Sequence, residues 1–154
     1  MQIRQLALDD PADLELLFGG IEQLFTELFG ASAAPEAGTG ARVRQQLAER
    51  PAQFWAFLAT DDAGRPLALL TLAESFAVFA HGYYGIINEL WVRSDARSRG
   101  VGARMLEHCQ AFARDRGWQR IDVSAPPNPA WDRSFAFYLQ RGFVHTGRKL
   151  RFLL

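Results

Sequence analysis

The sequence predicts one mixed α/β (α+β) domain over residues 1–154, with a central mixed sheet of about six or seven strands and about four helices. Three observations support this: the order of strand-like and helix-like segments, a meander of neighbouring strands in the middle, and a glycine-rich turn between a strand and a helix. A chain of 154 residues buries roughly 70% of its unfolded surface, which is enough for a full core.

The N-terminal part predicts a strand followed by two helices. Residues 3–8 alternate like a strand, and Asp10 with Pro11 forms a typical helix start, with Asp10 as N-cap. Apolar side chains then recur at three- and four-residue steps and define one helix face: Leu14, Leu17, Phe18, Ile21, Leu24, Phe25 and Leu28. Residues 30–40 read as a loop and residues 41–49 as a second helix.

The middle and C-terminal parts alternate between strands and helices. Residues 54–59 and 67–72 predict a hairpin around the turn at 61–66, with a third strand at 83–92. A helix over 102–116, which Gly117 ends, precedes a short strand at 121–125. A last helix at 131–140 and a closing strand or pair at 144–153 complete the order.

The stretch Arg97-Ser98-Arg99-Gly100-Val101-Gly102 predicts a phosphate-binding turn. Two glycines let the backbone turn tightly and approach a ligand, and the free amides at the start of the next helix attract an anion. A dinucleotide fingerprint needs a third glycine where Met105 stands, and a Walker loop needs Gly-Lys-Ser/Thr, so both are excluded. Arginines at 93, 97, 99 and 104 add positive charge, although they also fit a solvated face.

Two motifs together resemble the GNAT superfamily of acyl-CoA-dependent N-acetyltransferases. The first is Arg-x-x-Gly-x-Gly after Leu90-Trp91-Val92, and the second is Phe137-Tyr138-x-x-x-Gly142-Phe143. They cover about residues 86–143, and the predicted element order matches the family's. The resemblance implies the GNAT fold, with two splayed strands forming the cleft for acetyl-CoA as acyl donor substrate.

The resemblance also assigns roles to residues near the cofactor. It places Leu90 and Val92 on the pantetheine arm through their backbone groups. Asn128 matches the family loosely, because an Asn commonly stands closer to the Tyr, and it also reads as a turn residue beside Pro129. The pyrophosphate and adenosine end is assigned to the glycine turn and the residues after it: Arg97, Ser98, Arg99, Gly100, Val101, Gly102, Ala103 and Arg104.

Acetyl transfer to an amine needs a deprotonated nucleophile and a proton for the leaving thiolate. The resemblance makes Tyr138 the general acid near the sulfur; its alternative is a core aromatic. Glu89 is the candidate general base, although it can also be read as a structural carboxylate. Glu74 is a second candidate base, and a water relay without a dedicated base is a further alternative. Asn88 stands where some amine acetyltransferases have their Glu.

Composition narrows the function classes. Acidic and basic residues balance at 17 each, which argues against a general nucleic-acid or membrane surface. The single cysteine, Cys109, and the scattered His81, His108 and His145 predict no disulfide and no metal site. Without a recognisable signal peptide we expect a cytoplasmic protein, and the resemblance implies a homodimer.

The sequence therefore predicts an N-acetyltransferase that moves acetyl from acetyl-CoA to a primary amine of a small molecule. A protein or peptide acceptor is the second choice, and a non-catalytic acetyl-CoA-binding sensor is a third reading. A nucleotide or nucleic-acid binder that uses the arginines is the remaining alternative.

Overall fold

The computed structural model describes residues 1–30, 39–49, 53–125 and 131–147. The chain divides into two compact units, Met1–Asp122 and Val123–Leu154. The described residues form five strands and four α-helices in an α+β arrangement.

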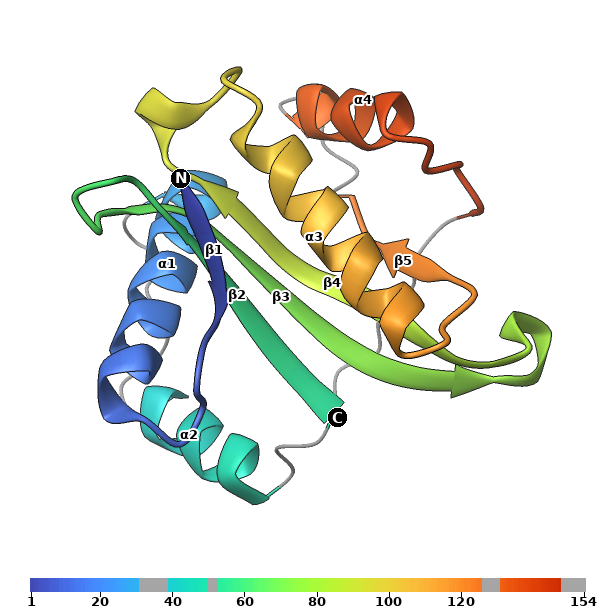
Figure 1. The fold of residues 1–154 in the computed structure, drawn as a ribbon, viewed down its shortest axis with the longest axis horizontal. Helices are drawn as coiled ribbons and strands as arrows, with labels where there is room; N and C mark the ends of the chain where they lie inside the picture. The colour runs from blue at the N-terminus through green and yellow to red at the C-terminus, as the bar shows by residue number, and fades with distance from the viewer. Residues whose placement is uncertain (31–38, 50–52, 126–130, 148–154) are drawn as a thin grey trace. The chain divides into compact units, whose positions relative to one another are not determined.

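The strands follow one another across the sheet in the order β1-β2-β3-β4-β5, as the labels in Figure 1 show. The strands are β1 (Gln2–Gln5), β2 (Phe54–Thr60), β3 (Pro66–Ala77), β4 (Gly82–Val92) and β5 (Ile121–Val123). The helices are α1 (Pro11–Phe29), α2 (Thr39–Glu49), α3 (Val101–Asp115) and α4 (Asp132–Gln140). Strands β1 to β4 pair antiparallel in sequence order, which confirms the predicted meander.

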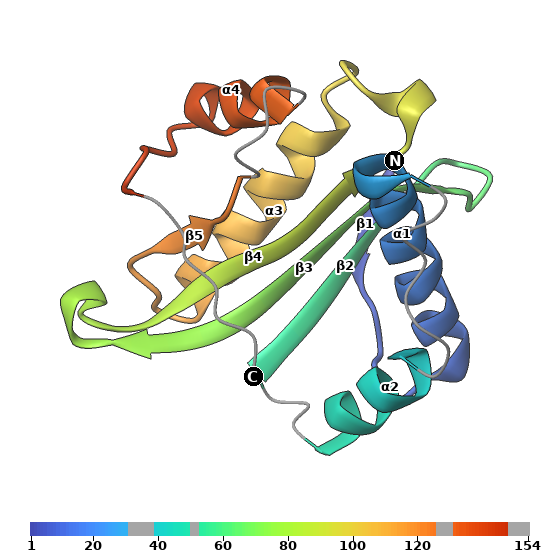
Figure 2. The same cartoon turned by 180° about the vertical axis from the view of Figure 1, so that it is seen from behind.

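Helices α1 and α3 cover opposite faces of the sheet. Successive side chains of a strand point to opposite faces. On β2, Leu58 joins a buried cluster with Leu17 of α1, while the neighbouring Phe57 meets Phe112 of α3 with ring centroids 5.1 Å apart. Figures 1 and 2 show the sheet and these helices from either side. Any side chain on β3 or β4 can therefore be assigned to the α1 face or the α3 face.

The start of α1 forms as predicted and is anchored to β1. The Asp10 carboxylate accepts the backbone N–H of Ala12 at 2.9 Å, and Pro11 occupies the first helical position. One turn on, the buried Asp13 accepts two bonds from the Arg4 guanidinium, at 2.5 and 2.7 Å. Asp13 also accepts the backbone N–H of Ala7 at 2.8 Å. These bonds fix the helix start against the end of the first strand.

Two adjacent glycines in α1 have different surroundings, which gives a matched stability test. A Cβ on Gly20 would lie 2.8 Å from Cδ2 and 3.2 Å from Cβ of Leu69, whereas one on Gly19 would have nothing within 4 Å. We expect Gly20→Ala to lower the free energy of unfolding by about 1–2 kcal/mol through overpacking. Gly19→Ala should raise it by about 0.5–1 kcal/mol through better helix propensity.

Urea unfolding followed by circular dichroism measures both variants. Equal effects of the two substitutions would contradict the close packing of α1 on β3 at Gly20.

Helix α3 ends in a glycine cap, as predicted. Gly117 is left-handed with φ 73°, its N–H bonds the carbonyl of Arg114 at 2.9 Å, and the N–H of Trp118 bonds that of Ala113 at 3.0 Å. This is the Schellman pattern, in which the residue after the glycine packs back on the helix. Trp118 accordingly is 6% exposed, so the cap also adds an indole to the core.

Some predicted boundaries differ from the structure. The first strand ends at Gln5, although the N–H of Leu6 still bonds the carbonyl of Ala56, which is next in the register, at 2.8 Å. Strand β3 continues past residue 72 to Ala77, because β4 pairs with it back to Gly82. No strand forms over residues 144–147, and 148–154 lie outside the described residues. Six to seven strands therefore overstates the number, which is five in the described part.

Candidate functional site

The predicted glycine turn lies between the end of β4 and the start of α3. Its backbone is left-handed twice, at Ser98 with φ 60° and at Gly100 with φ 81°. Gly100 is the N-cap of α3, and a glycine there avoids the strain that a Cβ would cause at this φ. The sequence reading of a tight turn that leads into a helix is therefore confirmed.

The first turn of α3 is not capped by its own N-cap residue. That residue is Gly100, which has no side chain to bond the amides that follow. The first regular bond of the helix joins the N–H of Arg104 to the carbonyl of Gly100 at 3.1 Å. The preceding amides, at residues 101–103, lie at the positive end of the helix dipole. This is the arrangement that binds phosphate groups in proteins.

The four arginines near the turn divide into two kinds. Arg93 bonds Asp95 at 2.6 Å and the carbonyl of Pro66 at 2.8 Å, and Arg97 bonds the carbonyl of Val92 at 2.8 Å. These two side chains brace the end of β4. Arg99 and Arg104 are exposed, and Arg104 touches only the carbonyl of Met1, at 3.4 Å, among the contacts of the described residues. They provide positive charge at the surface beside the turn.

Strand β4 contains a β-bulge just before its C-terminal end. Thr71 pairs with Glu89 and Leu72 with Ile87, so Asn88 is an extra residue on β4. Ile87 lies opposite Leu72, on the α3 face where Trp118 also packs. Without the bulge, Glu89 would share that face, because residues two apart point the same way. The bulge instead turns Glu89 to the α1 face, together with Trp91.

Glu89 is held by one hydroxyl. Thr71 lies directly opposite on β3, and its Oγ1 donates to Oε2 of Glu89. Oγ1 of Thr71 also accepts the backbone N–H of Glu89 at 3.1 Å. Burial raises the pKa of Glu89 above its ordinary value, and the hydrogen bond from Thr71 opposes this rise. A carboxylate whose pKa is raised in this way is suited to accept a proton near neutral pH.

A second carboxylate joins α1 to the end of β4 and to the turn. Oε1 of Glu27 accepts the indole N–H of Trp91 at 3.3 Å, and Oε2 pairs with the guanidinium of Arg97. Leu90 and Val92, on either side of Trp91, pair with Leu70 and Ala68 of β3. The backbone of this part of β4 is therefore held from both neighbouring elements.

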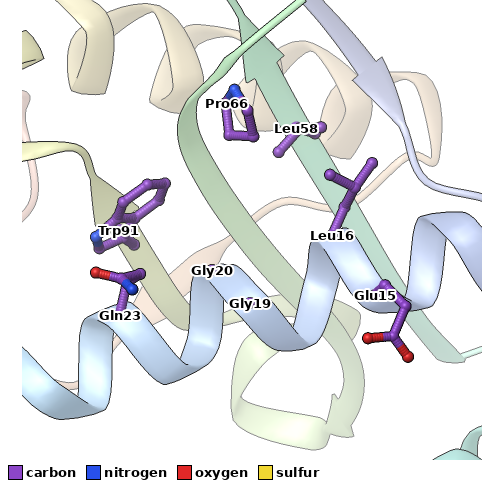
Figure 3. A pocket seen from close by; sticks show the side chains of 8 residues that line it. All are labelled: Glu15, Leu16, Gly19, Gly20, Gln23, Leu58, Pro66 and Trp91. Atoms are coloured by element: carbon purple, nitrogen blue, oxygen red, sulfur yellow. The ribbon is translucent and has the colours of Figure 1, made fainter.

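A cavity of about 180 Å³ lies on the α1 face beside the end of β4. Figure 3 shows Trp91 at one side of it and Glu15 and Gln23 projecting from α1. Gly19 and Gly20 form its helical wall, and its other lining residues are Leu16, Leu58 and Pro66. The lining is mainly apolar, with polar groups contributed by α1.

Tyr138 belongs to the second unit, on α4. Its carbonyl accepts the N–H of Phe143 at 3.1 Å, and Gly142, with φ 85°, bonds the carbonyl of Leu139 at 3.1 Å. The rings of Tyr138 and Phe143 are 5.4 Å apart. The Tyr-x-x-x-Gly-Phe motif is thus a Schellman cap with its hydrophobic contact, which fixes the Tyr138 backbone at the helix end.

Cysteine and histidine side chains have structural roles in the described part of the chain. Cys109 is buried, and burial raises the pKa of its thiol to about 12, so the thiolate needed for nucleophilic attack is not formed near neutral pH. The ring of His108 packs on Phe57 and that of His145 on Phe135. In the residues that the structure describes, no three His, Cys, Asp or Glu side chains come together to hold a metal.

The first unit brings together most of the predicted site residues. Glu89, Leu90 and Val92 lie in the last four residues of β4. Residues 97–104 follow in the loop after this strand and in the first turn of α3. Asn128 lies outside the described residues, and Glu74 instead bonds the indole of Trp118 at 2.9 Å. Sequence reasoning missed Thr71 and Glu27. A lone Thr in an apolar strand and a Glu on a helix carry no signal without the register.

The fold and this turn define a class: an α+β protein in which a bulged strand and a glycine turn lead into a helix. A family model for the acetyltransferase (GNAT) family matches residues 20–143. The chain belongs to this acetyltransferase family. No curated protein matches the sequence. No helix in the described ranges is long and apolar enough to cross a bilayer.

Solved structures share the fold along almost the whole chain. A probable acetyltransferase is 23% identical with a TM-score of 0.74, covering 100% of this chain and 97% of its own. An aminoglycoside acetyltransferase from an uncultured soil metagenomic sample is 21% identical with a TM-score of 0.78, covering 99% and 97%. A second one from such a sample, in complex with sisomicin, is 18% identical with a TM-score of 0.77, covering 99% and 95%.

Proposed function

We propose that the protein transfers an acetyl group from acetyl-CoA directly to a primary amine of a small molecule. The observation that carries the proposal is the left-handed Gly100 turn, which leads from the loop after β4 into the first amides of α3. Membership of the acetyltransferase family supports a donor with a thioester and a diphosphate.

The donor fits the chemistry of this turn. The pyrophosphate of acetyl-CoA would rest on the amides of Val101, Gly102 and Ala103, with the exposed Arg99 and Arg104 beside it. The pantetheine arm would follow the backbone of Leu90 and Val92. Because Arg97 is bonded to Glu27 and to the carbonyl of Val92, its guanidinium braces the turn while its backbone contributes to the anion site.

The transfer needs one proton acceptor and one proton donor. Glu89 would take a proton from the ammonium, directly or through water, and so generate the neutral amine that attacks the thioester carbonyl. After the attack the nitrogen of the tetrahedral intermediate carries one extra proton, which passes to water. Collapse of the intermediate then breaks the C–S bond and releases the CoA thiolate. Tyr138 would return a proton to that sulfur. No covalent acyl-enzyme is required, because the amine attacks the thioester itself.

A small-molecule acceptor is favoured by the neighbouring structures. Two proteins that share the fold act on aminoglycosides, which carry primary amines. The cavity beside Trp91 is lined mainly by apolar side chains, and the carboxylate of Glu15 at its edge already pairs with Arg44 at 2.8 Å. A peptide amine is the second acceptor class.

Calorimetric titration tests the donor. We expect acetyl-CoA to bind at least about tenfold more tightly than NAD or ATP at the same ionic strength, a difference of about 1.4 kcal/mol. Equal affinity for all three would mean that the turn binds polyphosphates without selecting CoA. Absence of acetyl-CoA binding would overturn the proposal.

Thiol release in the presence of candidate acceptors then tests the acceptor class. We expect turnover with small primary amines, among which an aminoglycoside panel is the first choice. Turnover confined to peptides with a free N-terminus or lysine would replace the small-molecule acceptor by a peptide acceptor. Binding of acetyl-CoA without turnover on any amine would favour the sensor reading.

A further inference from the structure

Thr71 is the one polar side chain in the described core that faces the candidate base. It lies in the middle of β3 and is completely buried, 0% exposed, between Leu70 and Leu72. A buried hydroxyl must satisfy its hydrogen-bonding groups to be tolerated in a core. Among the described residues, the Thr71 hydroxyl does so through Glu89, once as acceptor and once as donor.

The bulge explains why both bonds go to Glu89. The extra residue Asn88 interrupts the regular ladder between β3 and β4. At this point the backbone N–H of Glu89 bonds Oγ1 of Thr71 at 3.1 Å. A hydroxyl has a single proton to donate. While Oγ1 of Thr71 accepts the amide N–H, its own proton is donated to the carboxylate of Glu89. The backbone and side chain of Glu89 are thus fixed by the same oxygen.

We propose that Thr71 is the positioning residue for Glu89, fixing the direction of its carboxylate and keeping it ionised for proton transfer from the acceptor amine. This rests on the proposed role of Glu89 as general base. Thr71 is fully buried, so it acts through Glu89 and does not itself touch the substrates.

The electrostatic surroundings of Glu89 make this hydroxyl important. Burial is the largest cause of its raised pKa, and Thr71 is the group that opposes the rise. On α1, the carboxylate of Glu27 bonds the indole of Trp91, two residues after Glu89 on β4, and pairs with Arg97. On β3, the other carboxylate is Glu74, which bonds Trp118 on the α3 face. No cation of the described residues bonds Glu89, so loss of the hydroxyl is not compensated.

An NMR titration of the free protein tests the bond without any assay of activity. With 13C-labelled glutamate, the side-chain carboxyl signal of Glu89 is assigned by its loss in Glu89→Gln. We expect Thr71→Val, which keeps the shape and removes the hydroxyl, to raise the pKa of Glu89. Thr71→Ser keeps a hydroxyl and should leave the pKa close to wild type. An unchanged pKa in Thr71→Val would overturn the proposal.

Steady-state kinetics then test the positioning role. Because a general base must be ionised, the rate rises with pH through the pKa of Glu89. We expect Thr71→Val to shift the rising part of the pH–rate profile to higher pH and to lower kcat about tenfold or more near neutral pH. The KM for acetyl-CoA should stay within about twofold. Thr71→Ser should restore the limb, which a merely structural role would not predict.

The two measurements separate the bond from the base. A shifted carboxyl pKa together with an unmoved rate limb would uphold the Thr71–Glu89 bond and overturn Glu89 as the base, leaving acetyl-CoA binding to test the donor. Should Thr71→Val fail to fold, Thr71→Cys keeps a similar volume with a weak donor and should give the same direction of shift.

Discussion

Tyr138→Phe is expected to lower kcat by about 10²- to 10³-fold, while the affinity for acetyl-CoA stays within about twofold. The substitution keeps the aromatic ring that packs against Phe143 and Phe137, so the helix cap is preserved. What it removes is the hydroxyl that would protonate the departing thiolate. An effect on kcat without an effect on donor binding is the pattern of a group that acts only in the transition state.

Thiol release and calorimetry measure the two quantities. Tyr83→Phe is the matched control, because it makes the same chemical change on the β3–β4 hairpin, where Tyr83 is 58% exposed. We expect it to leave kcat unchanged. Unchanged turnover in Tyr138→Phe would remove Tyr138 from the mechanism, and a large loss of acetyl-CoA affinity would reassign it to donor binding.

Gly102→Asp is expected to weaken acetyl-CoA binding by at least about 100-fold without unfolding the protein. Gly102 is the second residue of α3, where a carboxylate can accept the free amides and interact favourably with the dipole. The new side chain would therefore stabilise the helix by up to about 1 kcal/mol. At the same time it would occupy the anion site and repel the pyrophosphate.

A raised melting temperature combined with lost binding is the signature to look for. Ala111→Asp places the same charge on an exposed position of α3, nine residues further along, and should leave binding unchanged. Calorimetry and thermal unfolding of the two variants suffice. Retained affinity in Gly102→Asp would show that the phosphates bind elsewhere.

Much of the fold could be predicted from local signals. The Asp10 cap, the hairpin turn at 61–66 and the glycine end of α3 depend on residues a few positions apart, and all form as expected. In the hairpin, the Asp61 carboxylate accepts the N–H groups of Ala63 and Arg65. The glycine turn was equally local, because the left-handed backbone at residue 100 favours a residue without a Cβ.

The arrangement around Glu89 could not be predicted in the same way. Alternation along β4 places Ile87 and Glu89 on one face, and only the register with β3 shows that Asn88 is an extra residue. The bonds from Thr71 and the contact of Glu27 with Trp91 cross 18 and 64 positions of sequence, respectively. The single domain, the homodimer, the cytoplasmic location and the role of Asn128 stay predictions.

The contrast between Asp13 and Glu89 has a consequence for how the folded state exchanges protons with solvent. The Arg4 guanidinium lowers the pKa of Asp13, so its stabilisation is present above the ordinary aspartate value and is lost as pH falls through the lowered one. Burial raises the pKa of Glu89, so its contribution is present below the ordinary glutamate value and is lost as pH rises through the raised one. Unfolding therefore takes up a proton at one carboxylate in acid and releases one at the other at higher pH. The ionised carboxylate of Glu89 therefore lowers the stability of the folded protein, whereas the ionised carboxylate of Asp13 raises it.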